Sequence, residues 1–305
     1  MNKPKVLLVV GPTAVGKTQL SIELAKQFNG EVISGDSMQV YRHLDIGTAK
    51  VTSVEQEHIP HYLIDIREVS EGFTVAQFVD EATNLIRQIT ARGKLPIIVG
   101  GTGFYLQALL DGLRLGSPAD KQRRQFWQTM LAKHDQLWLW QQLDERDPKA
   151  ADQIPMGNSR RVIRALEVFE STGHSILEQE RRSQQFDALI VGLTTDRAVL
   201  YERINHRVDE MMTAGLIEEA RWLYERRQVA PQASRGIGYK ELFEYFEDQE
   251  SLNEAIAAIK QHSRHYAKRQ LTWFRHQLPV EWFDLVSGAD TIVEIEQRVA
   301  DWQSK

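Results

Sequence analysis

The sequence predicts an α/β fold, in which helices cover both faces of a parallel sheet and an all-helical segment is inserted into the chain. Short apolar runs alternate with amphipathic stretches over the first hundred residues, and this alternation indicates the sheet. Glycine-rich turns follow two of these runs, at the sheet edge where such folds bind ligands. Residues 117–187 show helical patterns and no convincing strand, which indicates the insertion.

The elements follow from the spacing of apolar residues. Apolar runs predict strands at 6–10, 32–33, 62–66, 95–99, 188–193 and 282–285. Helical spacing predicts helices over 17–28 and 75–92, and mostly helical structure over 196–275, with breaks near 231 and 236–238. Residues 1–116 and 188–305 are therefore expected to form the core, and residues 117–187 the helical insertion.

Length and composition exclude several classes of protein. The 305 residues allow about two domains. With 42% hydrophobic and 26% charged residues, the chain is not disordered, collagen-like or a coiled coil. The formal net charge of −5 means that any contact with nucleic acid must use a local patch. No cysteine is present, and no apolar run approaches the ~20 residues of a membrane span, so we expect a cytoplasmic protein without a membrane partner.

A phosphate-binding motif lies between the first predicted strand and helix. It reads Gly11, Pro12, Thr13, Ala14, Val15, Gly16, Lys17, Thr18 and matches the P-loop pattern in full. Its amide N–H groups and the helix N-terminus would hold a phosphate, Lys17 would supply a cation, and the Thr18 hydroxyl could bind Mg²⁺. The motif predicts a P-loop NTPase-like sheet that binds a di- or triphosphate. It does not choose the reaction, and the alternative is a plain glycine turn.

Two further segments follow strands at the same sheet edge. Asp36 comes just after the strand at 32–33, where a carboxylate could bind Mg²⁺ or accept a proton. From spacing alone, Asp36 could equally well be the N-cap residue of a helix. The glycines at 100, 101 and 103 allow close approach to a ligand and would place Thr102 at the site, although a tight turn explains them as well.

A basic segment lies near the C-terminus. The 26 residues between Glu254 and Glu281 contain no acidic side chain. Lys260, Arg264 and Lys268 are spaced to form one stripe on a helix, and aromatic residues are interleaved with the basic ones. This pattern suits the phosphates and exposed bases of RNA, but a solvated face over an amphipathic core helix remains the alternative.

Taken together, these motifs resemble the tRNA dimethylallyltransferase family, also called tRNA isopentenyltransferases. The resemblance rests on the P-loop and on the segments 36–41, 47–50, 60–65, 100–105, 161–168, 236–239 and 268–275, in the family's order. It implies transfer of the dimethylallyl group of dimethylallyl diphosphate to N6 of the adenosine immediately 3′ of the anticodon, in tRNAs reading codons that begin with U. Diphosphate would leave, Mg²⁺ would be the cofactor, the tRNA anticodon stem-loop the partner, and the protein a monomer.

The resemblance also implies residue roles. Asp36 would accept the N6 proton, and Lys17 and Arg207 would stabilise the leaving diphosphate, which residues 11–18 hold with Mg²⁺ on Thr18. Thr102 would contact the target nucleotide and belong to the catalytic set. Contacts with tRNA would involve Asp36, Ser37, Met38, Gln39, Thr102, Arg124, Arg160, Arg161, Val162, Ile163, Arg164, Arg235, Gly236, Ile237, Gly238, Tyr239, Lys240, Lys268, Arg269 and Arg275. Phe274 departs from the family's more usual leucine.

Three rival interpretations stay open at this stage. A P-loop small-molecule kinase shares the P-loop and an acidic base but needs a lid with arginines, and release of ADP would reveal it. An adenylate isopentenyltransferase shares the chemistry but needs neither the helical insertion nor the basic segment, and AMP would be its acceptor. A non-catalytic RNA-binding module leaves Asp36 beside a complete P-loop unexplained.

Overall fold

The structure, a computed structural model, describes residues 3–112, 121–178, 185–288 and 290–305, which divide into two units. The first unit comprises Met1–Leu110 and Gln184–Lys305, and the second Asp111–Ser183. The second unit overlaps the predicted insertion over 117–187. Residue 117 lies outside the described residues, whereas Asp187 pairs with Lys5 at the start of a strand and so belongs to the sheet.

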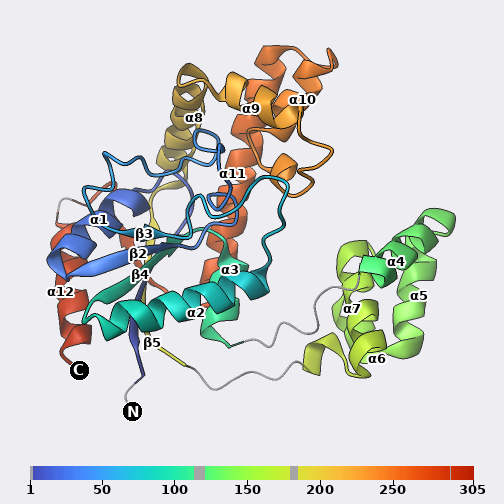
Figure 1. The fold of residues 1–305 in the computed structure, drawn as a ribbon, viewed down its shortest axis with the longest axis horizontal. Helices are drawn as coiled ribbons and strands as arrows, with labels where there is room; N and C mark the ends of the chain where they lie inside the picture. The colour runs from blue at the N-terminus through green and yellow to red at the C-terminus, as the bar shows by residue number, and fades with distance from the viewer. Residues whose placement is uncertain (1–2, 113–120, 179–184, 289) are drawn as a thin grey trace. The chain divides into compact units, whose positions relative to one another are not determined.

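A six-stranded parallel sheet forms the centre of the first unit, in the order β3-β2-β4-β1-β5-β6 (Figure 1). The strands are β1 (Lys5–Val10), β2 (Gly30–Ser34), β3 (His61–Tyr62), β4 (Leu95–Gly100), β5 (Asp187–Thr194) and β6 (Glu281–Asp284). The α/β prediction is confirmed, and five of the six predicted strands lie within two residues of their observed ends. The prediction over 62–66 is wrong after Tyr62, because positive φ angles at Leu63 (61°) and Asp65 (55°) end the strand.

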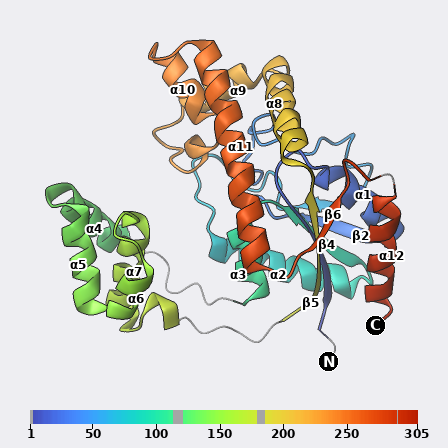
Figure 2. The same cartoon turned by 180° about the vertical axis from the view of Figure 1, so that it is seen from behind.

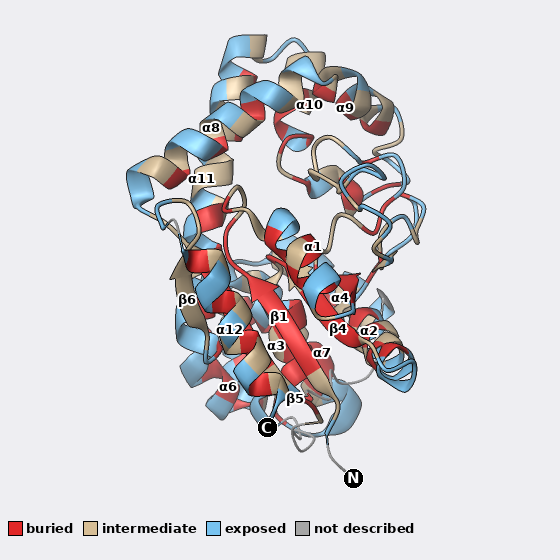
Figure 3. Cartoon of the chain, turned by 90° about the vertical axis from the view of Figure 1, so that its left-hand side faces the viewer, coloured by how far each residue is buried: buried red, intermediate tan, exposed pale blue. Residues whose placement is uncertain are grey.

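Helices cover both faces of this sheet (Figures 1 and 2). The helices are α1 (Lys17–Gln27), α2 (Val75–Ala91), α3 (Gly103–Leu110), α8 (Arg197–Thr213), α9 (Leu216–Tyr224), α10 (Lys240–Phe246), α11 (Leu252–Gln277) and α12 (Thr291–Gln303), with a 3₁₀ turn η2 at Ala233–Arg235. Leu7 and Val9 of β1 pack with α1 and α12, whereas Val6 and Leu8 pack with α2, α3 and α11. This alternation covers β1 on both faces, and the strand is buried along almost its whole length in Figure 3.

Local sequence fixes where the covering helices begin. Thr74 and Gln77 form a reciprocal capping box at the start of α2, and Ser251 and Glu254 form another at the start of α11. Helices α8, α9 and α10 lie beyond the carboxyl ends of the strands (Figure 1). They therefore add walls to the sheet edge at which a parallel α/β fold binds its ligands.

The second unit has its own small helical core. It contains α4 (Lys121–Lys133), α5 (Gln136–Arg146), α6 (Pro148–Gln153), α7 (Ser159–Thr172) and a 3₁₀ turn η1 at Ile176–Glu178. Trp127, Leu143 and Leu166 are among the buried side chains that join these helices. None of the described helices in either unit has the length and apolar character needed to cross a bilayer.

Candidate active site

The P-loop connects β1 to α1 at the carboxyl edge of the sheet. Gly11 (φ 138°) lies so close to β5 that a Cβ would be 2.5 Å from the Leu193 carbonyl oxygen, which explains why glycine is needed. Gly16 precedes α1 and provides no side-chain cap, unlike Thr74 at α2. Among the described residues, the first-turn amides of α1 thus donate no hydrogen bond to an N-cap side chain, and such amides suit an anion.

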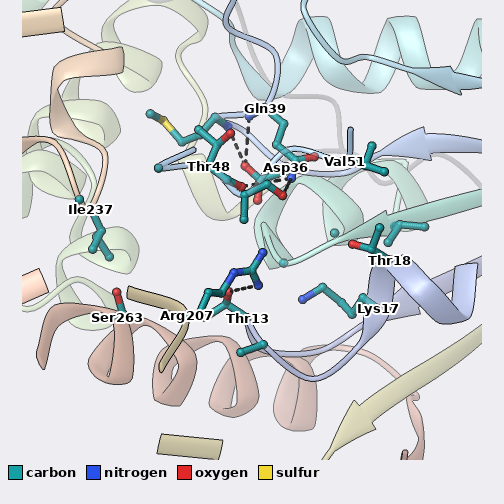
Figure 4. Close-up of a pocket in the computed structure, with 18 of the residues that line it drawn as sticks. Thr13, Lys17, Thr18, Asp36, Gln39, Thr48, Val51, Arg207, Ile237 and Ser263 are labelled. Carbon is teal, nitrogen blue, oxygen red and sulfur yellow. Dashed lines mark hydrogen bonds between the residues drawn. The ribbon is translucent and has the colours of Figure 1, made fainter. Parts of the chain in front are cut away.

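Two cations converge on the space in front of this loop. Figure 4 shows the Lys17 amine and the Arg207 guanidinium directed toward the same space from α1 and α8. Burial and, to a smaller extent, the charge of Arg207 lower the pKa of Lys17 to about 7, while Asp36 opposes the shift. Burial also lowers the pKa of Arg207, which donates a hydrogen bond to Thr13 Oγ1 at 3.2 Å. Two crowded cations are stabilised by a bound anion, so the geometry fits a diphosphate.

Asp36 lies on the other side of the same space (Figure 4). Its Oδ1 accepts hydrogen bonds from the Met38 amide at 2.8 Å and the Gln39 amide at 3.4 Å, which forms a tight turn and not the cap of a helix. Within the part of the chain that the structure describes, both bonds use Oδ1, so Oδ2 is available to accept a proton. Thr102 Oγ1 accepts a hydrogen bond from the Ser37 amide at 3.1 Å and so orients the Asp36 segment.

These groups open into one cavity of about 1430 Å³. Its walls come from the P-loop, residues 36–39, α8, residues 235–240 and one side of α11. Its apolar lining includes Ile22, Val51 and Met211, so that the cavity offers an apolar surface beside the cationic one. Thr102, Lys268 and Arg275 do not line it, whereas the exposed side chains of Arg235, Lys240 and Arg269 do.

Two carboxylates hold the far wall of the cavity in place. Glu219 accepts hydrogen bonds from the backbone amides of residues 45, 46 and 47 and from the Tyr239 hydroxyl, all between 2.7 and 2.9 Å. Buried Glu241 accepts from the Gly238 amide at 2.8 Å and lies 2.7 Å from His262 Nδ1. Hydrogen bonds to these two carboxylates thus hold the predicted contact segment 236–240 in place, and within it Tyr239 is fully buried.

The basic stripe on α11 is not one free surface, contrary to the sequence-based interpretation. Lys260 Nζ lies 2.6 Å from a carboxylate oxygen of Asp209, and Arg264 donates a hydrogen bond to Asn205 Oδ1 at 2.6 Å, so both face α8. Lys268 and Arg269, in contrast, are exposed, and the guanidinium of Arg269 lies 5.7 Å from the Tyr266 ring centre. Arg275 lies over Trp282 on β6, outside the cavity.

In the helical unit, the predicted contact residues of α7 divide by burial. Arg160 and Arg161 are exposed in its first turn. Val162 and Ile163 belong to the core of the unit, so their side chains do not face solvent as a contact would require. Arg124 and Arg164 both pair with Glu167, a carboxylate that is only 2% exposed. The helix therefore presents two arginines, and the ion pair between Arg124 of α4 and Glu167 joins the two helices.

Sequence reasoning missed several residues that shape the site. Gln270 and Arg203 both line the cavity, and Arg203 donates a hydrogen bond to the Ala14 carbonyl of the P-loop at 2.8 Å. A signal existed for Gln270, because it interrupts the apolar stripe that Ala267 and Phe274 define on α11. No local pattern indicated Glu219, since its backbone partners at residues 45, 46 and 47 are more than 170 residues away along the chain.

The fold and this site define a P-loop α/β protein with an anion site and a carboxylate in one cavity. Comparison with known proteins then gives the family. The model described as IPP transferase matches residues 39–277, and the chain belongs to that family. As a member it is an enzyme of the transferase class.

Named relatives and solved structures agree with this membership. The chain is 54% identical to a tRNA dimethylallyltransferase of Latilactobacillus sakei, with all of both chains covered. It is likewise 54% identical to one of Enterococcus faecalis, with 98% and 97% covered. A tRNA isopentenylpyrophosphate transferase from Bacillus halodurans superposes with a TM-score of 0.76 at 47% identity, covering 99% of this chain and 97% of that one. A eukaryotic dimethylallyltransferase described as acting on tRNA gives 0.82 at 32% identity, covering 98% and 79%.

Proposed function

We propose that the protein transfers the dimethylallyl group of dimethylallyl diphosphate to N6 of the adenosine immediately 3′ of the anticodon, in tRNAs reading codons that begin with U. The observation that carries the proposal is that Lys17, Arg207 and Asp36 open into one cavity, which also has an apolar lining. The names of the relatives supply the substrate class. As part of the same proposal, the enzyme is cytoplasmic and monomeric.

The proposed reaction assigns a proton to Asp36. The N6 nitrogen forms a bond to the first carbon of the dimethylallyl group, and the bond from that carbon to the diphosphate oxygen breaks with its electron pair. The amine is a weak nucleophile because its lone pair is delocalised into the adenine ring. Asp36 accepts the N6 proton as positive charge develops, and the turn around Oδ1 holds the carboxylate in position.

The leaving diphosphate gains negative charge as this bond breaks. Lys17 and Arg207 lie where they can meet that charge, and their burial excludes water that would screen it. The amides at the start of α1 add a fixed positive dipole. The apolar part of the lining, including Ile22, Val51 and Met211, suits the five-carbon chain.

The residues present also fit the proposed Mg²⁺. Among the described residues no three His, Asp or Glu side chains gather as a protein cage. Mg²⁺ in phosphate sites typically takes one or two protein oxygens and completes its shell with phosphate oxygens and water. The Thr18 hydroxyl at the start of α1, which lines the same cavity as the two cations, matches such a sparse donor set. When bound, the ion would neutralise charge on the diphosphate.

A direct test is to incubate the protein with labelled dimethylallyl diphosphate, Mg²⁺ and unmodified tRNA, with AMP as a competing acceptor. We expect the label on tRNA and none on AMP. Replacing the labelled donor by ATP should give no ADP. Label on AMP would identify the adenylate-specific transferase, and production of ADP would identify a kinase.

We expect Lys268 and Arg269 to contact tRNA phosphates because both are exposed in the C-terminal half of α11, and Arg269 lines the cavity. Replacing both by alanine should weaken tRNA binding and lower the slope of log affinity against log salt concentration by roughly 0.7–0.9 per lost contact. Filter binding at several salt concentrations measures this slope. Lys260→Ala is the matched control, since its partner is Asp209 and its loss should reduce thermal stability and not the slope. An unchanged slope in the folded double variant would contradict the contact.

A further inference from the structure

A glutamine side chain joins the two loops that carry the chemistry. Gln270 lies on α11, is 6% exposed, and faces the sheet edge among apolar neighbours. Its Oε1 accepts a hydrogen bond from the Thr13 amide of the P-loop at 3.2 Å, and its Nε2 donates to the Gly101 carbonyl at 3.0 Å. Burying a primary amide costs free energy because the group loses its hydrogen bonds to water. Here the two hydrogen bonds, one at the oxygen and one at the nitrogen, offset that cost.

The bond to Thr13 fixes the direction of one peptide group. The Pro12–Thr13 peptide is trans, so its N–H and C=O point to opposite sides. On the N–H side is Gln270, and on the C=O side is Lys17, whose Nζ donates to the Pro12 carbonyl at 2.5 Å. Holding the N–H toward α11 therefore holds the carbonyl toward the Lys17 ammonium.

The side chain of Thr13, whose amide Gln270 holds, is also bonded to the second cation of the site. Thr13 Oγ1 accepts a hydrogen bond from Arg207, so that a rotation of the peptide would move partners of both cations. On its other side, Gln270 fills the space in front of Gly101. A Cβ on that glycine would lie 1.9 Å from Gln270 Nε2. Gly101 directly precedes Thr102, which orients the Asp36 segment.

We propose that Gln270 is a positioning residue, which orients the Pro12–Thr13 peptide so that its carbonyl holds the Lys17 ammonium in the diphosphate site, and which keeps the P-loop in register with the turn before Thr102. The proposal rests on the proposed function for the identity of the anion. It assigns α11 a role in the diphosphate site beyond the contacts with tRNA expected of Lys268 and Arg269.

The test compares Gln270→Ala, Gly101→Ala and the double variant, with Gln261→Ala as the matched control from an exposed position of the same helix. Gly101 is not among the residues with positive φ, so alanine there acts through its contact with Gln270 and not through backbone strain. Affinity for pyrophosphate is measured by calorimetry, the KM values for both substrates by transfer assays, and stability by thermal melting.

We expect each single variant to weaken pyrophosphate affinity and raise the KM for dimethylallyl diphosphate by about tenfold or more. The reason is that a displaced Lys17 ammonium would lose its hydrogen bond to the charged anion. The KM for tRNA should stay within about twofold. The double variant should bind pyrophosphate no more weakly than Gln270→Ala, because both changes break the same contact. The Gln261→Ala control should match the wild type.

Two results would overturn the inference. A purely structural role predicts lower melting temperatures that add in the double variant, with pyrophosphate affinity and both KM values unchanged. That outcome, with an active wild type, rejects the role of Gln270 and leaves the proposed function intact. A wild-type protein that neither binds pyrophosphate nor transfers the label rejects the proposed function, and the inference with it.

Discussion

Replacing Asp36 by asparagine is expected to lower the single-turnover rate of transfer by about 10²–10⁴-fold, the usual contribution of a positioned general base. The amide keeps an oxygen in the place of Oδ1, so the hydrogen bonds from the Met38 and Gln39 amides and the turn that they form should survive. It removes only the ability to accept a proton. Affinity for tRNA and the melting temperature should therefore stay close to the wild-type values.

Rapid-quench assays at saturating tRNA and dimethylallyl diphosphate measure this rate. Asp284→Asn is the matched control, because Asp284 Oδ1 accepts the amides of Val286 and Ser287 at 3.0 Å in a turn of the same kind after β6. It should transfer the group at the wild-type rate. A normal rate for Asp36→Asn would assign Asp36 to the turn alone and leave N6 without a base.

The sheet could be predicted from the sequence because its signal is local. In β1 and β4, uninterrupted apolar runs end in glycine, and both runs are buried on both faces of the sheet. The third strand misled the prediction for a physical reason. Residues 62–66 have apolar and β-branched character, but Leu63 and Asp65 adopt left-handed backbone conformations that no composition rule detects.

The site divides in the same way between local and distant features. The P-loop and Asp36 could be predicted because each chemical role is contained in a few consecutive residues. Helical spacing correctly placed Lys260 and Arg264 on one face of a helix. Spacing does not show which element packs against that face, and in the structure it is α8. Glu219 and Gln270 act across 172 and 257 residues from Gly47 and Thr13, so only the folded chain reveals them.

The Lys17 ammonium should decide both the affinity for diphosphate and its pH dependence. Lys17→Met removes a buried cation while keeping an unbranched side chain, and we expect pyrophosphate affinity at pH 6 to fall by about 100-fold, in line with the loss of a hydrogen bond between charged groups. The transfer rate should fall at least as far, since the charge on the diphosphate is greatest in the transition state. Lys3→Met, an exposed position before β1, is the matched control and should change neither quantity.

The pH dependence follows from the pKa of Lys17, which burial lowers to about 7. Below that pH the free site already carries the ammonium. As the pH rises through about 7 the free site loses its proton, and an anion must then draw a proton back onto Lys17 in order to bind. The advantage of the wild type over Lys17→Met in calorimetric titrations with pyrophosphate should therefore shrink by up to about tenfold per pH unit above 7. A constant ratio from pH 6 to 9, with both proteins folded, would show that Lys17 remains charged throughout and that burial does not control its affinity for the anion.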